Sequence, residues 1–81
     1  MAKISARGAT EVARVKCEDN LGRFYLYVMC SDGRILYRPV AARGERSIAF
    51  LLRGKLTKPE HITADYLEKV IRHDRFLPVV N

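Results

Sequence analysis

Aromatic and basic side chains alternate in the middle of the chain, and together they could bind a nucleic acid. Tyr25 and Tyr27 are two residues apart in a run typical of a strand, so their rings share one face. Aromatic rings on a strand can stack on bases, and neighbouring cations can neutralise phosphates. The candidate nucleic-acid-binding residues are Arg14, Lys16, Tyr25, Tyr27, Arg34, Arg38, Arg43 and Arg46.

The same residues allow two other interpretations. The long Arg and Lys side chains could simply cover exposed tyrosine rings through cation–π contacts. Val12, Met29 and Leu36 could instead make this face apolar enough to form a homodimer or to bind another protein, as an interaction module or an inhibitor does. The expected partner is therefore a nucleic acid or an acidic protein, with homodimerisation as a further alternative.

The positive charge is concentrated in the middle third of the chain. The protein has 81 residues and a formal net charge of +6. Between Arg34 and Lys58 there are seven basic residues and one acid, Glu45, so this segment carries the whole excess. Such clustering favours an acidic partner, although small domains also carry net charge of this size for solubility.

Other residue patterns that could carry chemistry are weak. Cys17 and Cys30 lack the close spacing of a zinc site, and we expect them to be free thiols in the core. His61 and His73 are twelve residues apart, too far along one helix to share a metal. The chain has no recognisable nucleophile elbow or Gly-rich phosphate loop. We therefore expect no enzyme activity, no cofactor and no metal.

Composition restricts the class of protein. Apolar residues make up 48% of the chain, too many for a disordered tail. No apolar run approaches the roughly 18 residues of a membrane span, and residues 1–8 lack the apolar core of a signal peptide. We expect one domain over residues 1–81, located in the cytoplasm and not bound to membrane.

A β-hairpin is expected around Ser31-Asp32-Gly33, which separates the β-prone runs 23–30 and 34–38. A two-residue Asp32-Gly33 loop would put Phe24, Leu26, Val28, Cys30, Ile35 and Tyr37 on the core face, and Tyr25, Tyr27, Met29, Arg34, Leu36 and Arg38 on the outer face. A three-residue loop would instead put Arg34 and Arg38 on the face of Phe24. We favour the two-residue loop because it separates apolar from basic side chains more cleanly.

Residues 10–17 are expected to join the same sheet. A four-residue loop, 19–22, would pair Cys17 with Phe24 and place Arg14 and Lys16 opposite the two tyrosines. Residues 47–53 are short and bounded by glycines, so they could form a strand or a helix. We interpret them as a fourth strand.

The last expected element is an amphipathic helix. Thr57-Lys58-Pro59-Glu60 has the spacing of a capping box and predicts the helix start. Its apolar side would comprise Ile62, Tyr66, Leu67, Val70 and Ile71, and its polar side would carry the pairs Asp65–Lys69 and Glu68–Arg72. The apolar tail 76–80 must dock on the core or on a partner. The predicted fold class is α+β: an antiparallel sheet of three to four strands with one C-terminal helix packed on it.

The N-terminal residues carry a resemblance. Lys3-Ile4-Ser5-Ala6-Arg7-Gly8, followed by Glu11-Val12-Ala13-Arg14, resembles the start of small uncharacterised proteins of actinobacteria and their phages. The resemblance covers about a fifth of the chain and ends before the part from Lys55 to Asn81. It implies a small α+β domain and a phage origin, in keeping with a protein that binds a host component, and it transfers no functional residue.

Overall fold

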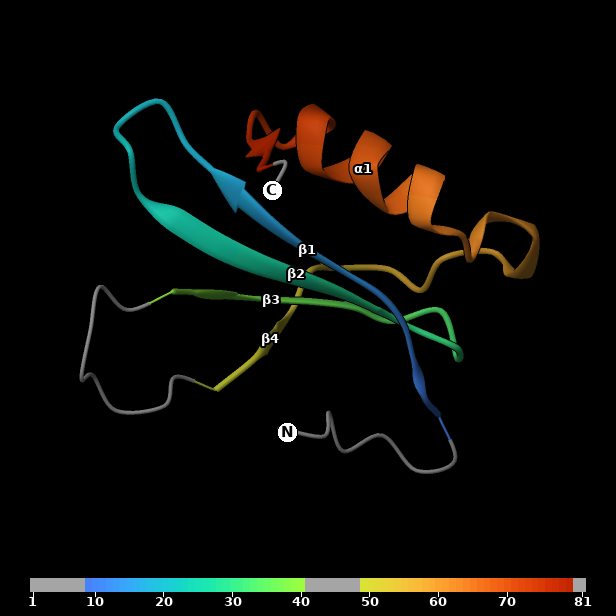
Figure 1. Cartoon of the computed structure of the whole chain (residues 1–81). Coiled ribbons are helices and arrows are strands. Elements are labelled where there is room, and N and C mark those ends of the chain that lie inside the picture. The colour runs from blue at the N-terminus through green and yellow to red at the C-terminus, as the bar shows by residue number, and fades with distance from the viewer. Residues whose placement is uncertain (1–8, 41–48, 80–81) are drawn as a thin grey trace.

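The protein folds as a five-stranded antiparallel sheet with one helix across one face (Figure 1). The computed structural model describes residues 9–40 and 49–79, so Arg43 and Arg46 lie outside the described residues. The elements are β1 (Glu11–Glu18), β2 (Phe24–Cys30), β3 (Ile35–Pro39), β4 (Leu51–Leu52), a 3-10 turn η1 (Pro59–His61), α1 (Ala64–His73) and β5 (Leu77–Pro78). The strand order is β4-β3-β2-β1-β5. The predicted α+β class is confirmed, with more strands than the three or four expected.

Both hairpins turn through three-residue loops of the same kind. The N–H of Gly22 donates to the carbonyl of Asp19 at 3.2 Å, and that of Gly33 donates to the carbonyl of Cys30 at 3.0 Å. Each glycine has a positive φ, +78° and +94°, which lets the chain re-enter the next strand after a β-turn. The predictions of both loop lengths are therefore wrong. The β1–β2 loop is one residue shorter than the predicted four, and the β2–β3 loop is one residue longer than the predicted two.

These two differences reverse the faces of β2. Tyr27 pairs with Val15 and Tyr37, and Leu26 pairs with Lys16 and Arg38. Tyr25 and Tyr27 therefore face α1, whereas the sequence analysis had placed them on the outer face. The error arose because β2 is apolar on both faces, so alternation could not select a register and the turn geometry decided it.

The main core lies between the sheet and α1. Its buried members are Cys17, Tyr27, Met29, Ile35, Leu67, Val70 and Ile71. Val28, Cys30 and Leu36 are buried on the other side of the sheet, with Leu26 and Phe50 packed against them. The central strand β2 thus contributes buried side chains to both faces, which explains its continuous apolar composition.

The helical region begins later than its capping-box spacing predicted. Residues 59–61 form only a 3-10 turn, and the α-helix starts after Thr63, whose side-chain oxygen accepts a hydrogen bond from the N–H of Tyr66 at 3.1 Å. Ile62 and the extended Thr63 separate the two segments. The apolar stripe of α1 nevertheless faces the core, as predicted, with Leu67, Val70 and Ile71 buried.

The end of α1 returns the chain to the sheet. The N–H of Phe76 donates to the carbonyl of Ile71 at 3.0 Å while Arg75 adopts a φ of +71°, a C-terminal cap usually built with glycine. Phe76 then packs on Tyr25, with ring centroids 4.8 Å apart, and β5 pairs with β1. Of the two alternatives predicted for the apolar tail, the core or a partner, Phe76 takes the first, whereas Leu77 pairs with β1 and stays 65% exposed.

Candidate nucleic-acid interface

The predicted binding residues are divided between two faces of the sheet. We call the face opposite α1 the far face. The strand register places four basic residues on this face: Arg14, Lys16, Arg34 and Arg38. Their neighbours there are Phe24 and Leu26, whereas the sequence predicted the two tyrosines at this position. Tyr25 is half-buried beneath Phe76, and Tyr27 is only 3% exposed. The proposed combination of tyrosine rings and basic side chains on one face therefore does not form.

The four far-face cations already have partners. Arg14 donates two hydrogen bonds to Glu11, at 2.8 and 3.0 Å, and Arg34 forms a 2.8 Å ion pair with Asp32. The ammonium of Lys16 lies 4.5 Å from the centre of the Phe24 ring, and the guanidinium of Arg38 lies 4.9 Å from that of Phe50. Lys16 and Arg38 thus lie over phenylalanine rings, whereas the sequence had suggested that basic side chains cover the tyrosine rings.

A second basic surface lies on the α1 side of the molecule. A groove of about 470 Å³ runs between residues 53–61 and α1, and a smaller hollow of about 330 Å³ adjoins it. Arg53, Tyr66 and Val70 line both hollows, so the two lie side by side. We call the combined hollow the basic groove; its cations and imidazoles are Arg53, Lys55, Lys58, Lys69, His61 and His73.

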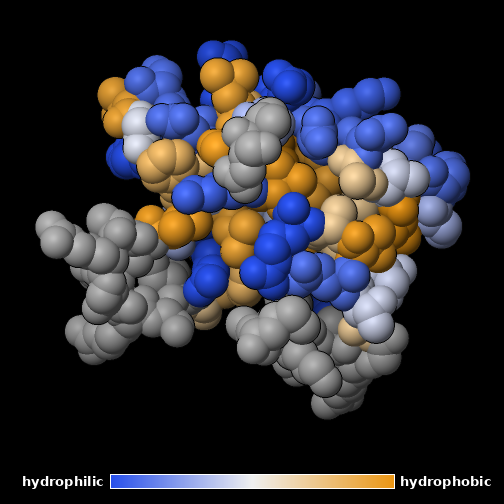
Figure 2. Space-filling model, viewed as in Figure 1, coloured by the Kyte–Doolittle hydropathy of each residue, from blue (hydrophilic) through white to orange (hydrophobic). Residues whose placement is uncertain are grey.

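The basic groove has an excess of positive charge that its own side chains do not neutralise. Among the described residues that line it, none is acidic. Lys55, Lys58 and Lys69 are exposed and form no ion pair with any described residue. The predicted pair Asp65–Lys69 is not formed, and neither is Glu68–Arg72, so Lys69 stays available to an external anion. Hydrophilic side chains dominate the outward side of α1 in Figure 2.

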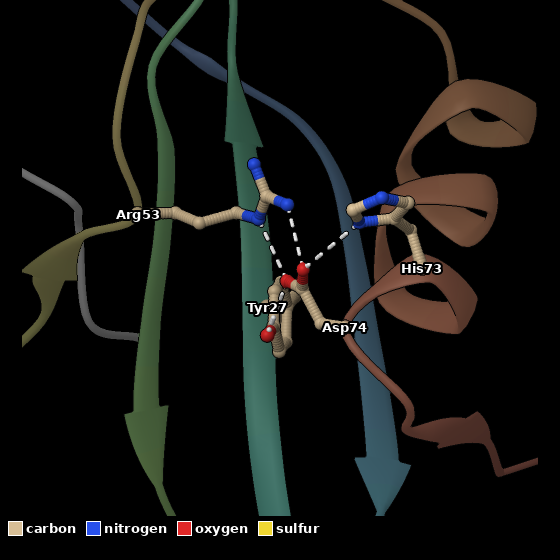
Figure 3. Close-up of polar contacts among 4 residues, drawn as sticks. All are labelled: Tyr27, Arg53, His73 and Asp74. Atoms are coloured by element: carbon tan, nitrogen blue, oxygen red, sulfur yellow. Dashed lines mark hydrogen bonds and ion pairs between the residues drawn. The ribbon is translucent and has the colours of Figure 1, made fainter.

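Arg53 differs from the lysines because the protein itself holds it in place. Its Nε and Nη2 atoms donate to the Asp74 carboxylate at 2.7 and 2.6 Å, and the Tyr27 hydroxyl donates to the same carboxylate at 2.9 Å. Figure 3 shows Arg53 reaching from the β4 side to Asp74, which follows α1. This bidentate pair connects the two walls of the basic groove and fixes the direction of the guanidinium.

The pKa shifts in this cluster follow from its hydrogen bonds and burial. Two hydrogen bonds from Arg53 hold the pKa of the Asp74 carboxyl below its usual value and raise the pKa of Arg53. Burial raises the pKa of the Tyr27 phenol, and its hydrogen bond to Asp74 raises it further. The cluster therefore keeps one charge arrangement at neutral pH and serves as a structural brace rather than a proton donor or acceptor.

The other wall of the groove is attached to the β2–β3 hairpin. The N–H of Thr57 donates to the carbonyl of Gly33 at 2.6 Å, and both Thr57 and Ile35 line the groove. A Cβ atom on Gly33 would lie 2.6 Å from the carbonyl oxygen of Thr57. The hairpin tip thus packs closely against the backbone between Lys55 and Lys58 and determines where these two lysines lie.

Two stacked rings complete the lining. The His61 ring is parallel to that of Tyr66, with 4.7 Å between centroids and 6° between planes. Tyr66 is partly buried against the core, whereas His61 is exposed. His73, at the other end of the groove, is 84% exposed and lies 3.7 Å from Asp74.

Other chemistry has less support among the described residues. Cys17 and Cys30 are free and buried on opposite sides of the sheet, and burial raises the pKa of Cys17 to about 11, so its thiol stays protonated. No three His, Cys, Asp or Glu side chains within 9–40 and 49–79 gather as metal ligands. In the same ranges, no helix combines the length and apolar character required to cross a membrane.

Comparison with protein-family models, with curated proteins and with solved structures gave no match, so the function is argued from geometry and charge.

Sequence analysis missed most of the basic groove. It noted Lys55 and Lys58 only as part of the 34–58 segment, and it assigned Lys69 to an ion pair on the helix surface. The usable signal was a lysine pair just before the helix together with a lysine on it. Only the tertiary fold brings the three lysines to one groove beside His61 and Tyr66.

Proposed function

We propose that the protein is a non-enzymatic nucleic-acid-binding protein and that the phosphates lie along the basic groove. The observation that carries this proposal is the set of lysines that line one groove without a carboxylate partner: Lys55, Lys58 and Lys69. Nucleic-acid affinity comes largely from the neutralisation of phosphates and the release of their counterions. A cation already paired within the protein contributes less, because binding must first break or share that pair.

This argument favours the groove over the far face. Arg14 and Arg34 would have to share their carboxylate partners, Glu11 and Asp32, before they could neutralise a phosphate. The groove lysines need no such exchange. Arg53 is paired with Asp74, so its part is to join the groove walls, and the three lysines supply the phosphate contacts.

The salt dependence of binding tests the proposal quantitatively. Three phosphate contacts predict a slope of log K against log salt of about −2 for a single strand and about −3 for a duplex. Affinity for a single strand should then fall roughly 20-fold between 50 and 200 mM salt. Fluorescence anisotropy with single- and double-stranded DNA and RNA measures this slope. Absence of binding at low salt would refute the proposed function.

Charge-neutralising variants locate the site. Lys58→Gln and Lys69→Gln should each weaken binding and make the slope shallower by about 0.7 to 0.9, the contribution of one phosphate contact. Lys16→Gln is the matched control, because it removes one lysine from the far face and the same net charge. An effect of Lys16→Gln as large as that of the groove variants would move the interface to the far face.

A second candidate function is self-association or the binding of a protein partner. Leu51 and Leu52, which form the edge strand β4, are 52% and 54% exposed, and Leu56 beyond them is exposed as well. An exposed apolar edge strand is a common pairing site. Light scattering tests this candidate: a dimer mass that Leu52→Lys reduces to the monomer mass, together with no nucleic-acid binding, would favour it.

The cellular location belongs to the same proposal. We place the protein in the cytoplasm, where two free thiols such as Cys17 and Cys30 remain reduced. Nucleic acid is also accessible there.

A further inference from the structure

The stack of His61 on Tyr66 forms part of the lining of the basic groove. Tyr66 packs against the core on one side and against His61 on the other, so the exposed side of the pair is that of His61. Both rings line the larger hollow together with Lys55 and Lys58. A flat ring beside lysines is the combination that holds a base and the phosphate next to it.

The backbone keeps this face in position before any ligand arrives. Pro59 begins the 3-10 turn that ends at His61, and the N–H of His61 donates to the carbonyl of Lys58 at 2.9 Å. On the other side, Thr63 caps α1 through the N–H of Tyr66. Because both rings are attached to hydrogen-bonded turns, little conformational entropy remains to be lost when a third ring stacks on them.

The size and lining of the hollow suit a single nucleotide. Its volume of about 470 Å³ lies within the usual range of small-molecule sites, and its lining combines the apolar Ile35 and Val70 with the two lysines. In a duplex, each base face is covered by its neighbours, so only an unpaired base can offer a face to His61. Phosphate contacts alone would not distinguish a single strand from a duplex in this way.

We propose that the ligand of the basic groove is single-stranded nucleic acid and that one unpaired base stacks on the exposed face of His61, with Tyr66 behind it. This inference rests on the proposed function. It adds the strand class of the ligand and names His61 as the residue that selects it.

Substitution of His61 tests the inference. His61→Ala should weaken binding of a single-stranded 12-mer of DNA or RNA by roughly 5- to 150-fold, the effect of losing one base–aromatic stack. Its salt slope should stay unchanged, because stacking releases no counterion. His61→Phe keeps a ring in place and should retain most of the affinity. Binding of a 12-base-pair duplex should be weaker than that of the single strand and insensitive to both variants.

A matched control and the opposite outcomes make the test decisive. Leu21→Ala removes an exposed side chain that does not line the groove, and it should change single-strand affinity less than about 2-fold. If His61→Ala binds the single strand as well as the wild type, or if duplex and single strand bind equally, the inference fails while groove binding stands. If neither form binds at low salt, the proposed function fails and the inference fails with it. His61→Phe is the second variant, which keeps the inference testable if the alanine variant does not fold: it should retain most of the single-strand affinity.

Discussion

Gly33 lies at the tip of the β2–β3 hairpin, and its replacement by alanine is expected to destabilise the protein more than the equivalent change at Gly22. The two glycines close loops of the same kind and have similar positive φ values, +94° and +78°. They differ in their surroundings. A Cβ on Gly33 would lie 2.6 Å from the Thr57 carbonyl oxygen, whereas a Cβ on Gly22 would meet only a Glu18 side-chain oxygen at 3.9 Å.

The magnitudes follow from these two geometries. An alanine in the left-handed region costs roughly 1–2 kcal/mol, and this is the whole expected effect of Gly22→Ala. Gly33→Ala carries the same cost and also forces two backbone segments apart, an overpacking that costs about 1–3 kcal/mol more. The expected loss of stability at Gly33 is therefore roughly 2–5 kcal/mol.

Thermal unfolding followed by circular dichroism measures both variants. In a domain of this size, 1 kcal/mol corresponds to a shift in Tm of about 4–8 °C. Gly33→Ala should also weaken nucleic-acid binding more than Gly22→Ala does, because the movement of Thr57 displaces the backbone that carries Lys55 and Lys58. Equal losses of stability at the two glycines would show that the hairpin tip does not pack against Thr57.

Three further predictions concern the helix and its C-terminal end. Arg75→Gly should stabilise the protein by about 1 kcal/mol in urea unfolding, since Arg75 occupies a left-handed φ of +71°; a loss of stability would contradict the assigned cap. Leu67→Ala should cost about 2–5 kcal/mol and Glu68→Ala less than about 0.5, because Leu67 is fully buried and Glu68 is exposed; equal costs would contradict the packing of α1. Because its partners lower the pKa of Asp74, the stability that its ionised form contributes should be complete above about pH 5 and lost as pH falls through that lowered pKa. Asp74→Asn should therefore be less stable than the wild type at neutral pH, with a gap that narrows in acid; a constant gap would contradict this coupling.

The sequence alone located the two hairpins and the C-terminal helix of this protein. Asp-Gly and the turn-rich residues before Phe24 marked both hairpins, and the period of Leu67, Val70 and Ile71 identified the buried side of α1. These signals are local, since turn chemistry and helical periodicity are present in a few consecutive residues. They sufficed for the α+β class.

Only the tertiary structure decided which side of β2 faces the helix. Every residue from Phe24 to Cys30 is apolar or aromatic, and both sides of the strand are buried, so alternation carried no information about its direction. A difference of one residue in each loop then moved Tyr27 from the expected surface to the core, where Asp74 satisfies its hydroxyl. The predicted binding face therefore lost its two tyrosines, and the candidate site is now the basic groove.

The basic groove depended on contacts between residues distant in sequence. Lys58 and Lys69 line adjoining hollows because Thr57 is bonded to Gly33 and Arg53 is bonded to Asp74. Neither contact leaves a pattern in the neighbouring residues, because each joins segments about twenty residues apart through one or two hydrogen bonds. The composition therefore predicted that the protein has a basic surface. The packing of the β2–β3 hairpin, residues 53–61 and α1 determined where that surface lies.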